Sequence, residues 1–238
     1  MESCQILGVR IDQISKKAIR DILIQKLQQG TFCHIATVNP EFLVETSRNP
    51  KFKTILNQTS LNICDGAGIS ILGRFFYGKK IERITGVELA EIICEVAEKL
   101  GKSVFLLGGW GVGKLVEQKI CSMFPKLKIV GTLDGDVNTF EEVQNANPDI
   151  VLVAFGAPKQ EYWIAEKGSQ ISSLRIGIGV GGTFDFWAGK ALRAPEILRK
   201  LGLEWLWRLI LQPRRWRRIV NAVIVFPWLV VREKVKKH

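Results

Sequence analysis

Polar residues and glycines follow several short apolar segments of this sequence, at points where β-strands would end. In "LNICDGAGIS", Asp65 follows such a segment and is itself followed by Gly66 and Gly68. Because glycines leave room beside it, this carboxylate can face an open cleft, although an aspartate in this position also commonly caps a helix. In "ATVNPEFLVE", Thr37 and Asn39 have the same arrangement, and the same two interpretations apply to them.

A glycine-rich turn, "SVFLLGGWGVGKLVEQ", lies between a predicted strand and a predicted helix. The segment from Gly108 to Lys114 fits GxxxxGK, but Leu115 stands where an NTPase loop needs Ser or Thr to hold magnesium. The spacing also misses GxGxxG, and no acidic residue is placed to bind a ribose in the dinucleotide manner. An ATPase or a dehydrogenase is therefore disfavoured. Gly108 and Gly109 are candidate contacts to a nucleotide phosphate at the helix N-terminus, the alternative being a tight turn only.

Two later turns have a similar composition. "AFGAPKQEYWI" places Gln160 at the start of a helix, and "GVGGTFDFWAG" follows three glycines with Asp185. Two such turns in series favour a site in which backbone N–H groups surround a phosphorylated ligand. "DGD" at 134–136 resembles the metal-binding DxD of many nucleotide-sugar transferases, but it is also ordinary turn chemistry, and we favour the turn. With two histidines and five dispersed cysteines, we predict neither a metal site nor a disulfide framework.

The elements that must position these turns alternate along the chain. Strands are predicted at "CQILGVRI", "FCHIATV", "LNICD", "SVFLLGG", "LKIVGTL", "DIVLVAFG" and "LRIGIGVGG". Helices are predicted at "SKKAIRDILIQKLQQG", "GVELAEIICEVAEKLG" and "GKLVEQKICSMF", the first capped by Ser15 and closed by Gly30, the second ending at Gly101. Several strands are apolar throughout, as is typical of parallel strands covered on both faces. We predict an α/β fold with a Rossmann-like, mostly parallel sheet flanked by helices, over residues 1–194.

Residues 195–238 are predicted to form a basic, Trp-rich helical appendage. The formal net charge of the chain is +11, and residues 204–238 hold nine Lys or Arg against two Glu, which leaves about +4 for the rest. Four of the seven tryptophans also lie there. The 13-residue apolar run from Ile219 to Val231 is shorter than the roughly 20 residues of a membrane-spanning helix. The N-terminal residues show no secretory signal, so a reducing cytoplasmic compartment is expected.

Taken together, several motifs resemble the WecG/TagA/CpsF family of bacterial glycosyltransferases. They are "TVNPEF", "CDGAGI", "RITGVEL", "LLGG", "AFGAPKQEYWI", "GVGGTFDFWAGKALRAP" and "LGLEWLWRLILQPRRWRR", and the resemblance runs from about Gly8 to Arg218. It implies an inverting, metal-independent transferase without cofactors that moves a sugar from a UDP donor to GlcNAc linked to undecaprenyl diphosphate. The members that this sequence resembles most use UDP-N-acetylmannosamine and begin the linkage unit of wall teichoic acid. Glucose or uronic-acid donors occur among relatives and stay open.

The resemblance also implies roles for the strand-end residues. Asp65 becomes the candidate general base that deprotonates the acceptor hydroxyl, and Thr37 and Asn39 would line the same pocket. Arg83, in "RITG", would balance charge on the departing UDP, a task for which metal-independent enzymes need fixed cations. Gln160 and Asp185 are implied contacts in the donor pocket.

A polyprenyl-linked acceptor gives the appendage a use at the membrane. Tryptophans and arginines on short helices broken at Pro213 and Pro227 suit an anionic membrane surface, which would place the protein peripherally on the inner face of the cell membrane. We also expect Arg214, Arg217 or Arg218 to complete the active site when this segment folds onto the body. The competing class is a nucleic-acid arm that stacks bases. The 13-residue apolar run has no purpose on a polyanion, so no nucleic-acid partner is expected, whereas apolar helices on the body favour self-association.

Overall fold

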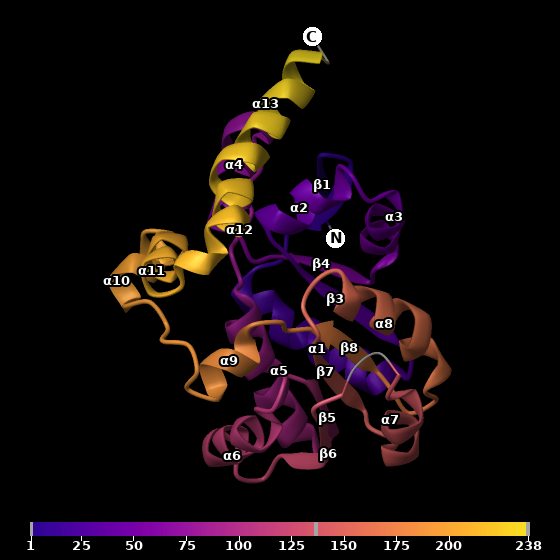
Figure 1. Ribbon diagram of the computed structural model, residues 1–238. Helices are drawn as coiled ribbons and strands as arrows, with labels where there is room; N and C mark the ends of the chain where they lie inside the picture. Colours follow the sequence, from indigo (N-terminus) through magenta and orange to yellow (C-terminus); the bar gives the residue numbers. More distant parts are fainter. Residues whose placement is uncertain (1, 136–137, 237–238) are drawn as a thin grey trace.

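A computed structural model describes residues 2–135 and 138–236 of the chain. These residues form a central sheet of six parallel strands in the order β4-β3-β8-β7-β5-β6 (Figure 1). The predicted α/β fold with a mostly parallel sheet is confirmed. The strands are β3 Cys33–Val38, β4 Leu61–Cys64, β5 Ser103–Gly108, β6 Lys128–Leu133, β7 Ile150–Ala154 and β8 Ile176–Gly179.

Both faces of the sheet are covered by helices, which explains why its strands are apolar throughout. In β7, Ile150 and Leu152 belong to the core on one face, and Val151 and Val153 belong to the core on the other. This alternation follows from the two-residue period of a strand. The first face is covered by α1 Lys16–Gln29, α5 Gly86–Leu100 and α6 Gly113–Met123, and the second by α7 Phe140–Ala146 and α8 Lys159–Lys167.

Local sequence signals fix the ends of the two longest helices. The Ser15 hydroxyl accepts a hydrogen bond from the Ala18 amide at the start of α1, and Gly30 closes that helix with a φ of 76°. Thr85 begins α5 with a capping box, and Gly101 ends it with a φ of 64°. All three predicted helices are confirmed. The ends of α1 and α5 could be read from the sequence because capping residues and left-handed glycines act within one turn of the helix end.

The N-terminal segment differs from its prediction. Instead of one strand, it forms an antiparallel hairpin of β1 Ser3–Ile6 and β2 Val9–Asp12. Leu7 and Gly8 make the two-residue turn with φ values of 53° and 74°, and a left-handed pair of this kind matches the twist of the strands. The hairpin packs in a separate apolar core with α2 Pro40–Thr46, α3 Pro50–Gln58 and α4 Ala67–Tyr77.

The C-terminal segment is helical but less interrupted than predicted. After α9 Thr183–Trp187 come α10 Glu196–Lys200, α11 Glu204–Leu211, a 3₁₀ turn Pro213–Arg215, α12 Trp216–Val220, a π-helical turn Asn221–Val225 and α13 Phe226–Lys236. Pro213 follows the end of α11, as predicted. The predicted break at Pro227 is wrong, because the helix continues through this residue. The wider π-helical turn before Pro227 tolerates the missing amide donor and leaves room for the proline ring.

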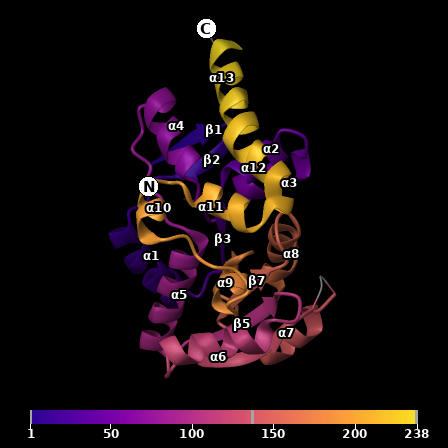
Figure 2. The ribbon, with the colours of Figure 1, turned by 60° about the vertical axis from the view of Figure 1, so that its left-hand side comes forward.

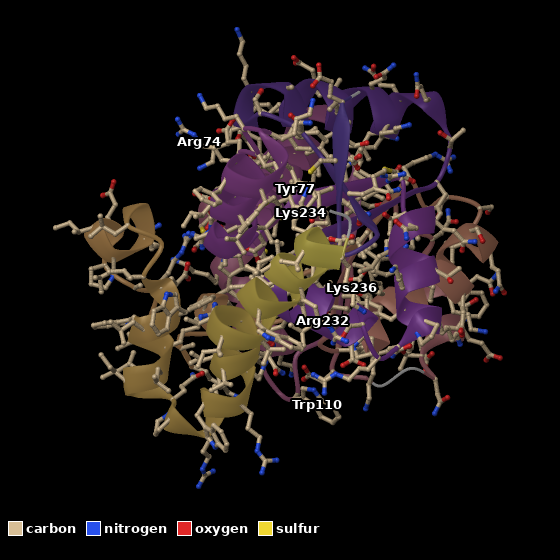
Figure 3. All side chains as sticks on the ribbon, turned by 90° about the horizontal axis from the view of Figure 1, so that it is seen from above. Arg74, Tyr77, Trp110, Arg232, Lys234 and Lys236 are labelled. Carbon is tan, nitrogen blue, oxygen red and sulfur yellow. The ribbon has the colours of Figure 1, made fainter. Side chains whose placement is uncertain are left out.

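The last helix, α13, packs on the body of the protein through α2 and α4, and its C-terminal end projects beyond the other elements (Figures 1 and 2). Phe226 and Val230 are fully buried in the core that contains the hairpin. Further along, the Tyr77 hydroxyl donates a hydrogen bond of 2.8 Å to Glu233, and Lys234 Nζ lies 3.6 Å from the centre of the Tyr77 ring (Figure 3). Across the described residues, no helix is long and apolar enough to cross a membrane. The predicted division between 194 and 195 stays a prediction.

We expect Phe226→Ala to lower the free energy of unfolding by roughly 3–5 kcal/mol, because it leaves a cavity where a fully buried ring was. Trp228→Ala, two residues further along the same helix at a ring that is more than half exposed, should cost about 1 kcal/mol or less. Urea unfolding monitored by circular dichroism measures both. Equal, small losses in the two variants would show that α13 is not packed on the body.

Candidate active site

A cavity of about 690 Å³ opens across the carboxyl ends of the strands. Its walls come from the turns after β4, β3, β8, β7 and β5, together with α11, the 3₁₀ turn and α12. The carboxyl ends of parallel strands are where α/β proteins bind ligands, because the helix N-termini and the turns converge there. The cavity is therefore the candidate active site.

Most of the residues predicted from the sequence meet in this cavity. Those that line it are Thr37, Asn39, Asp65, Arg83, Gly109, Gln160, Asp185 and Arg218. Gly108, Arg214 and Arg217 lie outside its lining. The predicted tail arginines therefore divide into one that faces the cavity and two whose side chains are exposed elsewhere.

The turns after β3 and β4 differ in whether their polar residues cap the following helix, a question that the sequence left open. Among the residues that the structure describes, no side chain caps α4, which begins after Gly66, so Asp65 is free of the capping role. Asn39 does cap α2, since its side chain accepts from the Phe42 amide at 3.1 Å, and it lines the cavity as well. The Thr37 hydroxyl donates to the Gly179 carbonyl at 3.2 Å, which ties β3 to β8 beside the site.

Three polar oxygens converge around Gly86, the first residue of α5. A Cβ atom on this glycine would lie 3.7 Å from Asp65 Oδ2, from Thr37 Oγ1 and from Thr183 Oγ1. Thr85 caps α5, so the motif "RITG" places the helix N-terminus directly beside Asp65. The missing side chain leaves space next to the carboxylate in which a substrate hydroxyl can sit.

Burial raises the pKa of Asp65 to about 6. Arg83 opposes this shift, Glu204 adds to it, and Arg208 and a backbone hydrogen bond from Gly86 lower the pKa again. A carboxylate with a pKa near 6 is still mostly ionised at neutral pH, yet it is a stronger base than an exposed aspartate. Asp65 thus has the protonation state and basicity that a general base requires.

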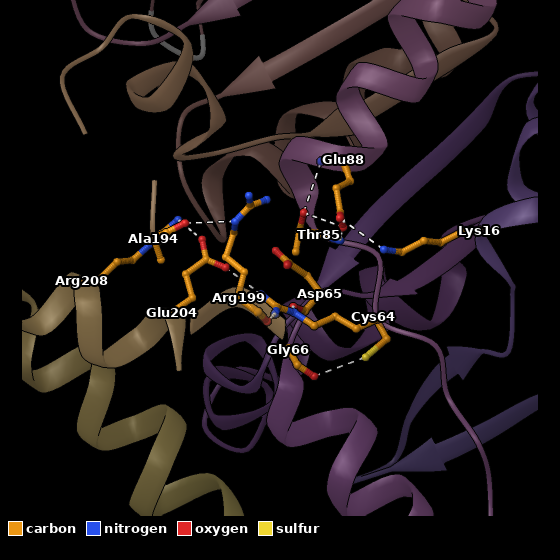
Figure 4. Close-up of polar contacts among 11 residues, drawn as sticks. Lys16, Cys64, Asp65, Gly66, Thr85, Glu88, Ala194, Arg199, Glu204 and Arg208 are labelled. Carbon is orange, nitrogen blue, oxygen red and sulfur yellow. Dashed lines mark hydrogen bonds and ion pairs between the residues drawn. The ribbon is translucent and has the colours of Figure 1, made fainter. Parts of the chain in front are cut away.

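Arg83 links the Asp65 turn to the C-terminal segment, where its partners are Arg199 and Glu204. Figure 4 labels Asp65 and these two partners. Its Nε donates to the Asp65 carbonyl at 2.8 Å, and its Nη1 donates to the Arg199 carbonyl at 3.3 Å. Its Nη2 forms an ion pair of 2.8 Å with Glu204 in α11. The charge of Arg83 is therefore already compensated, and its three bonds hold α10 and α11 against the strand end.

Further cations line the cavity from the C-terminal segment. Arg208 lies 3.8 Å from Glu204 and stacks on the Phe186 ring, with 4.6 Å between the guanidinium carbon and the ring centre. Arg215 Nη2 is 4.0 Å from Asp185. Burial lowers the pKa of Arg215, and the neighbouring charges of Arg218 and Arg208 lower it further.

Arg218 completes this cluster, and its Nε forms an ion pair of 2.6 Å with Glu41. Lys190 lines the same cavity. Neighbouring cations repel one another, and an anion placed between them relieves this repulsion. The cluster formed by Lys190, Arg208, Arg215 and Arg218 therefore suits a ligand with more than one negative charge, such as a diphosphate.

Gln160 lines the cavity, and two hydrogen bonds fix the orientation of its side-chain amide. Its Oε1 accepts from the Gly156 amide at 3.1 Å, and its Nε2 donates to Glu161 Oε1 at 3.1 Å. The other oxygen of Glu161, which is fully buried, lies 2.7 Å from His34 Nε2. A backbone amide only donates, so the contact with Gly156 requires the oxygen of the Gln160 side chain on that side and leaves the NH₂ group directed at Glu161.

The glycine-rich turn before α6 does not present a free helix N-terminus. The Gly113 amide donates to the Asp134 carboxylate at 3.0 Å, so an acidic side chain occupies the position where a phosphate would bind. A Cβ atom on Gly108 would approach the Ala154 backbone to 3.0 Å, so this glycine allows close packing of β5 on β7. Of the "DGD" segment, Asp136 lies outside the described residues.

Within residues 2–135 and 138–236, no three His, Cys, Asp or Glu side chains gather as ligands for a metal ion. The five cysteines are free thiols in the structure. Metal independence itself stays a prediction that requires an activity assay.

Several cavity residues were missed in the sequence. They are Gly86, Trp110, Thr183, Lys190, Glu204, Arg208 and Arg215. Gly86 stands within the motif "RITGVEL", and Glu204 and Arg208 stand within "LEWLWRL", so the motifs were visible. The sequence contains no signal that selects Arg215 over its neighbours in "PRRWRR", because that choice depends on the rotation of the 3₁₀ turn.

The parallel sheet, with an arginine-lined cavity at its carboxyl edge, is the arrangement of an α/β protein with a candidate site for a phosphorylated ligand. Residues 4–238 match the glycosyl transferase WecG/TagA/CpsF family, and the chain belongs to this family.

Three relatives are named N-acetylglucosaminyldiphosphoundecaprenol N-acetyl-beta-D-mannosaminyltransferase. The protein from Bacillus subtilis (strain 168) is 35% identical over 208 residues, which cover 85% of this chain and 81% of the relative. The protein from Bacillus spizizenii is 32% identical over 202 residues, with coverages of 82% and 77%. The protein from Staphylococcus aureus (strain MRSA252) is 30% identical over 240 residues, with coverages of 97% and 93%.

The pH dependence of turnover tests the role of Asp65. The acceptor proton can be taken only by the ionised carboxylate, so kcat/KM should fall about tenfold per pH unit below a pKa of about 6 and be level above it. Asp65→Asn should lower kcat by roughly 10²- to 10⁴-fold and remove this acidic limb, while the affinity for UDP stays close to that of the wild type. Initial rates across pH and calorimetric titration with UDP give the two readouts.

Stability separates this role from a structural one. The pKa of Asp65 is raised in the folded state, so the folded protein loses stability as the pH rises toward and through 6. At neutral pH, Asp65→Asn should therefore leave the free energy of unfolding unchanged or raise it, by at most about 3 kcal/mol. A variant that unfolds more easily than the wild type at pH 7 would identify Asp65 as a structural residue instead.

Proposed function

We propose that this protein is an inverting, metal-independent glycosyltransferase that moves N-acetylmannosamine from UDP-N-acetylmannosamine to GlcNAc carried on undecaprenyl diphosphate. The product would be the β-1,4-linked disaccharide that begins the wall teichoic acid linkage unit. One observation carries the proposal: a carboxylate with a raised pKa and an arginine cluster suited to a diphosphate line one cavity. The family and the names of the relatives supply the substrate classes.

The reaction follows from this arrangement. Asp65 accepts the proton of the acceptor hydroxyl as its oxygen forms a bond to the anomeric carbon of the donor sugar. The bond between that carbon and the β-phosphate oxygen breaks on the opposite face, and UDP leaves with the electron pair. Direct displacement inverts the anomeric configuration, so an α-linked donor gives a β-linked product. The open space beside Gly86 is where the attacking hydroxyl would lie.

The departing UDP develops negative charge that fixed cations can stabilise. Arg208, Arg215 and Arg218 line the cavity with counter-ions that are side chains of the protein itself. When a donor diphosphate binds, Arg215 and Arg218 would exchange their ion pairs with Asp185 and Glu41 for bidentate contacts with phosphate oxygens. We assign leaving-group stabilisation chiefly to these arginines, and to Arg83 a more indirect part, because Glu204 compensates its charge.

The C-terminal segment would hold the enzyme on the anionic inner face of the membrane. Large apolar side chains are exposed along α10–α13: Ile197, Leu201, Leu206, Ile210, Trp216, Ile224, Trp228 and Val235. Arg214, Arg217, Arg232 and Lys236 lie in the same segment, and each basic residue near such a surface contributes about 1 kcal/mol. The side chains that contact lipid and the arginines that contact the donor thus share one segment, which covers the cavity.

A panel of UDP-sugars assayed with one lipid-linked GlcNAc acceptor tests the proposed donor. UDP-N-acetylmannosamine should be the preferred donor, ahead of UDP-glucose and of UDP-N-acetylmannosaminuronic acid. Preference for another UDP-sugar would keep the reaction class and change the product to a different surface polysaccharide. Binding of RNA instead of transfer, seen as a gel shift without turnover, would favour the nucleic-acid alternative.

We expect the transferase activity to survive chelation. After dialysis against EDTA, the rate should stay within roughly twofold of the untreated enzyme, because arginines rather than a divalent metal ion neutralise the leaving group. A loss of more than about tenfold that manganese or magnesium restores would contradict metal independence.

The arginines of "PRRWRR" offer a matched comparison within one segment. On a short-chain soluble acceptor, which removes the need for membrane anchoring, Arg215→Ala and Arg218→Ala should lower kcat by about 10- to 100-fold. Arg214→Ala and Arg217→Ala should leave this rate nearly unchanged, since both side chains are exposed outside the cavity lining.

With the acceptor in anionic vesicles, Arg214→Ala and Arg217→Ala should lower the rate through weaker binding to the surface. Steady-state rates on the two acceptors, with vesicle sedimentation, distinguish these effects. Equal losses in all four variants on the soluble acceptor would show that the cluster acts only through its overall charge.

A further inference from the structure

The turn after β5 contains an unusual backbone. Gly108, Gly109, Trp110 and Gly111 follow one another with φ values of 93°, 100°, 52° and 78°, all in the left-handed region. Glycine adopts this region without strain, whereas a residue with a Cβ atom is disfavoured there. A tryptophan therefore stands where the local backbone favours glycine.

The Trp110 side chain brings no compensating contribution to the folded core. It is 73% exposed, and it belongs to none of the apolar cores that the described residues form. Figure 3 shows it projecting from the ribbon at the edge of the molecule. Strained residues of this kind are retained at sites of function rather than for stability.

The position of Trp110 in the cavity indicates which part of a ligand it meets. Trp110 lines the cavity through the turn after β5, whereas Asp65 follows β4, and three strands, β3, β8 and β7, lie between these two. With neighbouring strands about 4.8 Å apart, the two turns are separated by roughly 19 Å across the sheet. If the reacting sugar carbon lies beside Asp65, Trp110 is near the opposite end of the donor, which in a UDP-sugar is the base.

Charge at this end of the cavity also favours a neutral group. The flanking Gly109 and Gly111 bring no cation, and the Asp134 carboxylate occupies the adjacent N-terminus of α6. A phosphate placed there would meet a negative charge, whereas a planar, uncharged base would not. An exposed indole ring offers such a base a stacking surface.

We propose that Trp110 binds the nucleobase of the donor by stacking, and so sets the affinity for the nucleotide at the end of the cavity remote from Asp65. The inference rests on the proposed function, since it takes the donor to be a nucleoside diphosphate sugar. It makes Trp110 a binding residue that acts on the donor and not on the acceptor. The cavity then divides into a base end at Trp110, a diphosphate region at the arginine cluster and a reaction centre at Asp65.

Trp110→Gly and Trp110→Phe, compared by calorimetric titration with UDP and with pyrophosphate, test this proposal. Trp110→Gly should weaken UDP binding by about 5- to 150-fold, the range for loss of one stacked base, and raise the KM for the donor with little change in kcat. Pyrophosphate affinity should not change, because that ligand has no base. Trp110→Phe should retain most of the UDP affinity. The melting temperature of Trp110→Gly should be unchanged or higher, since glycine relieves the left-handed strain.

Three outcomes would overturn the proposal. Equal UDP affinity in Trp110→Gly and the wild type would show that the ring does not contact the base. Equal losses for UDP and pyrophosphate would point to general damage of the cavity. Weaker sedimentation with vesicles of phosphatidylglycerol and phosphatidylethanolamine, at unchanged UDP affinity, would identify the exposed Trp110 as a membrane contact instead. A wild-type protein that binds no UDP at all would instead refute the proposed function itself.

Discussion

The ion pair between Arg83 and Glu204 joins the two parts of the chain that build the cavity. Through its Nε, Arg83 holds the carbonyl of Asp65, and through its Nη2 it holds α11, each at 2.8 Å. The two side chains are mostly shielded from water, at 22% and 14% exposure, so loss of either would leave an uncompensated charge in a poorly solvated place. Arg208 lies one turn after Glu204 in α11, so this ion pair also sets where Arg208 lies relative to Asp65.

The same network sets the electrostatics of the site. Arg83 and Arg208 lower the pKa of Asp65 while burial and Glu204 raise it, and the balance leaves a carboxylate that is ionised at neutral pH but basic. Three arginines of the C-terminal segment, Arg208, Arg215 and Arg218, are paired with Glu204, Asp185 and Glu41, respectively. In the proposed function, an incoming diphosphate would take the place of Asp185 and Glu41, and these two carboxylates hold the cluster in position before the ligand arrives. One cavity thus contains both a basic carboxylate and a cluster of cations. The two lie together because the C-terminal segment packs over the carboxyl ends of the strands.

Much of the fold was predictable from short-range patterns. Strands that are apolar throughout indicated a parallel sheet covered on both faces, and Ser15, Gly30 and Gly101 marked helix ends, because capping acts within a single turn. The rule that ligands bind at the carboxyl ends of parallel strands selected the turns that contain Thr37, Asp65 and Gln160, and all three line the cavity. Two predictions failed for local reasons. The turn at Leu7 and Gly8 interrupts an apolar run that resembles one strand, and a π-helical turn accommodates Pro227.

The sequence by itself determined the class of fold, the turns that form the site and the family to which the chain belongs. Periodicity, capping and strand-end turns depend on neighbouring residues, so they can be recognised along the chain. The tertiary structure decided which side chains of those turns face the cavity. Arg215 and Arg218 face it while Arg214 and Arg217 do not, and Arg83 is paired with a glutamate 121 positions away. Trp110 is prominent only because its backbone angles and exposure are known. These features depend on helix rotation and on contacts between distant segments, and packing fixes both only when the whole chain has folded.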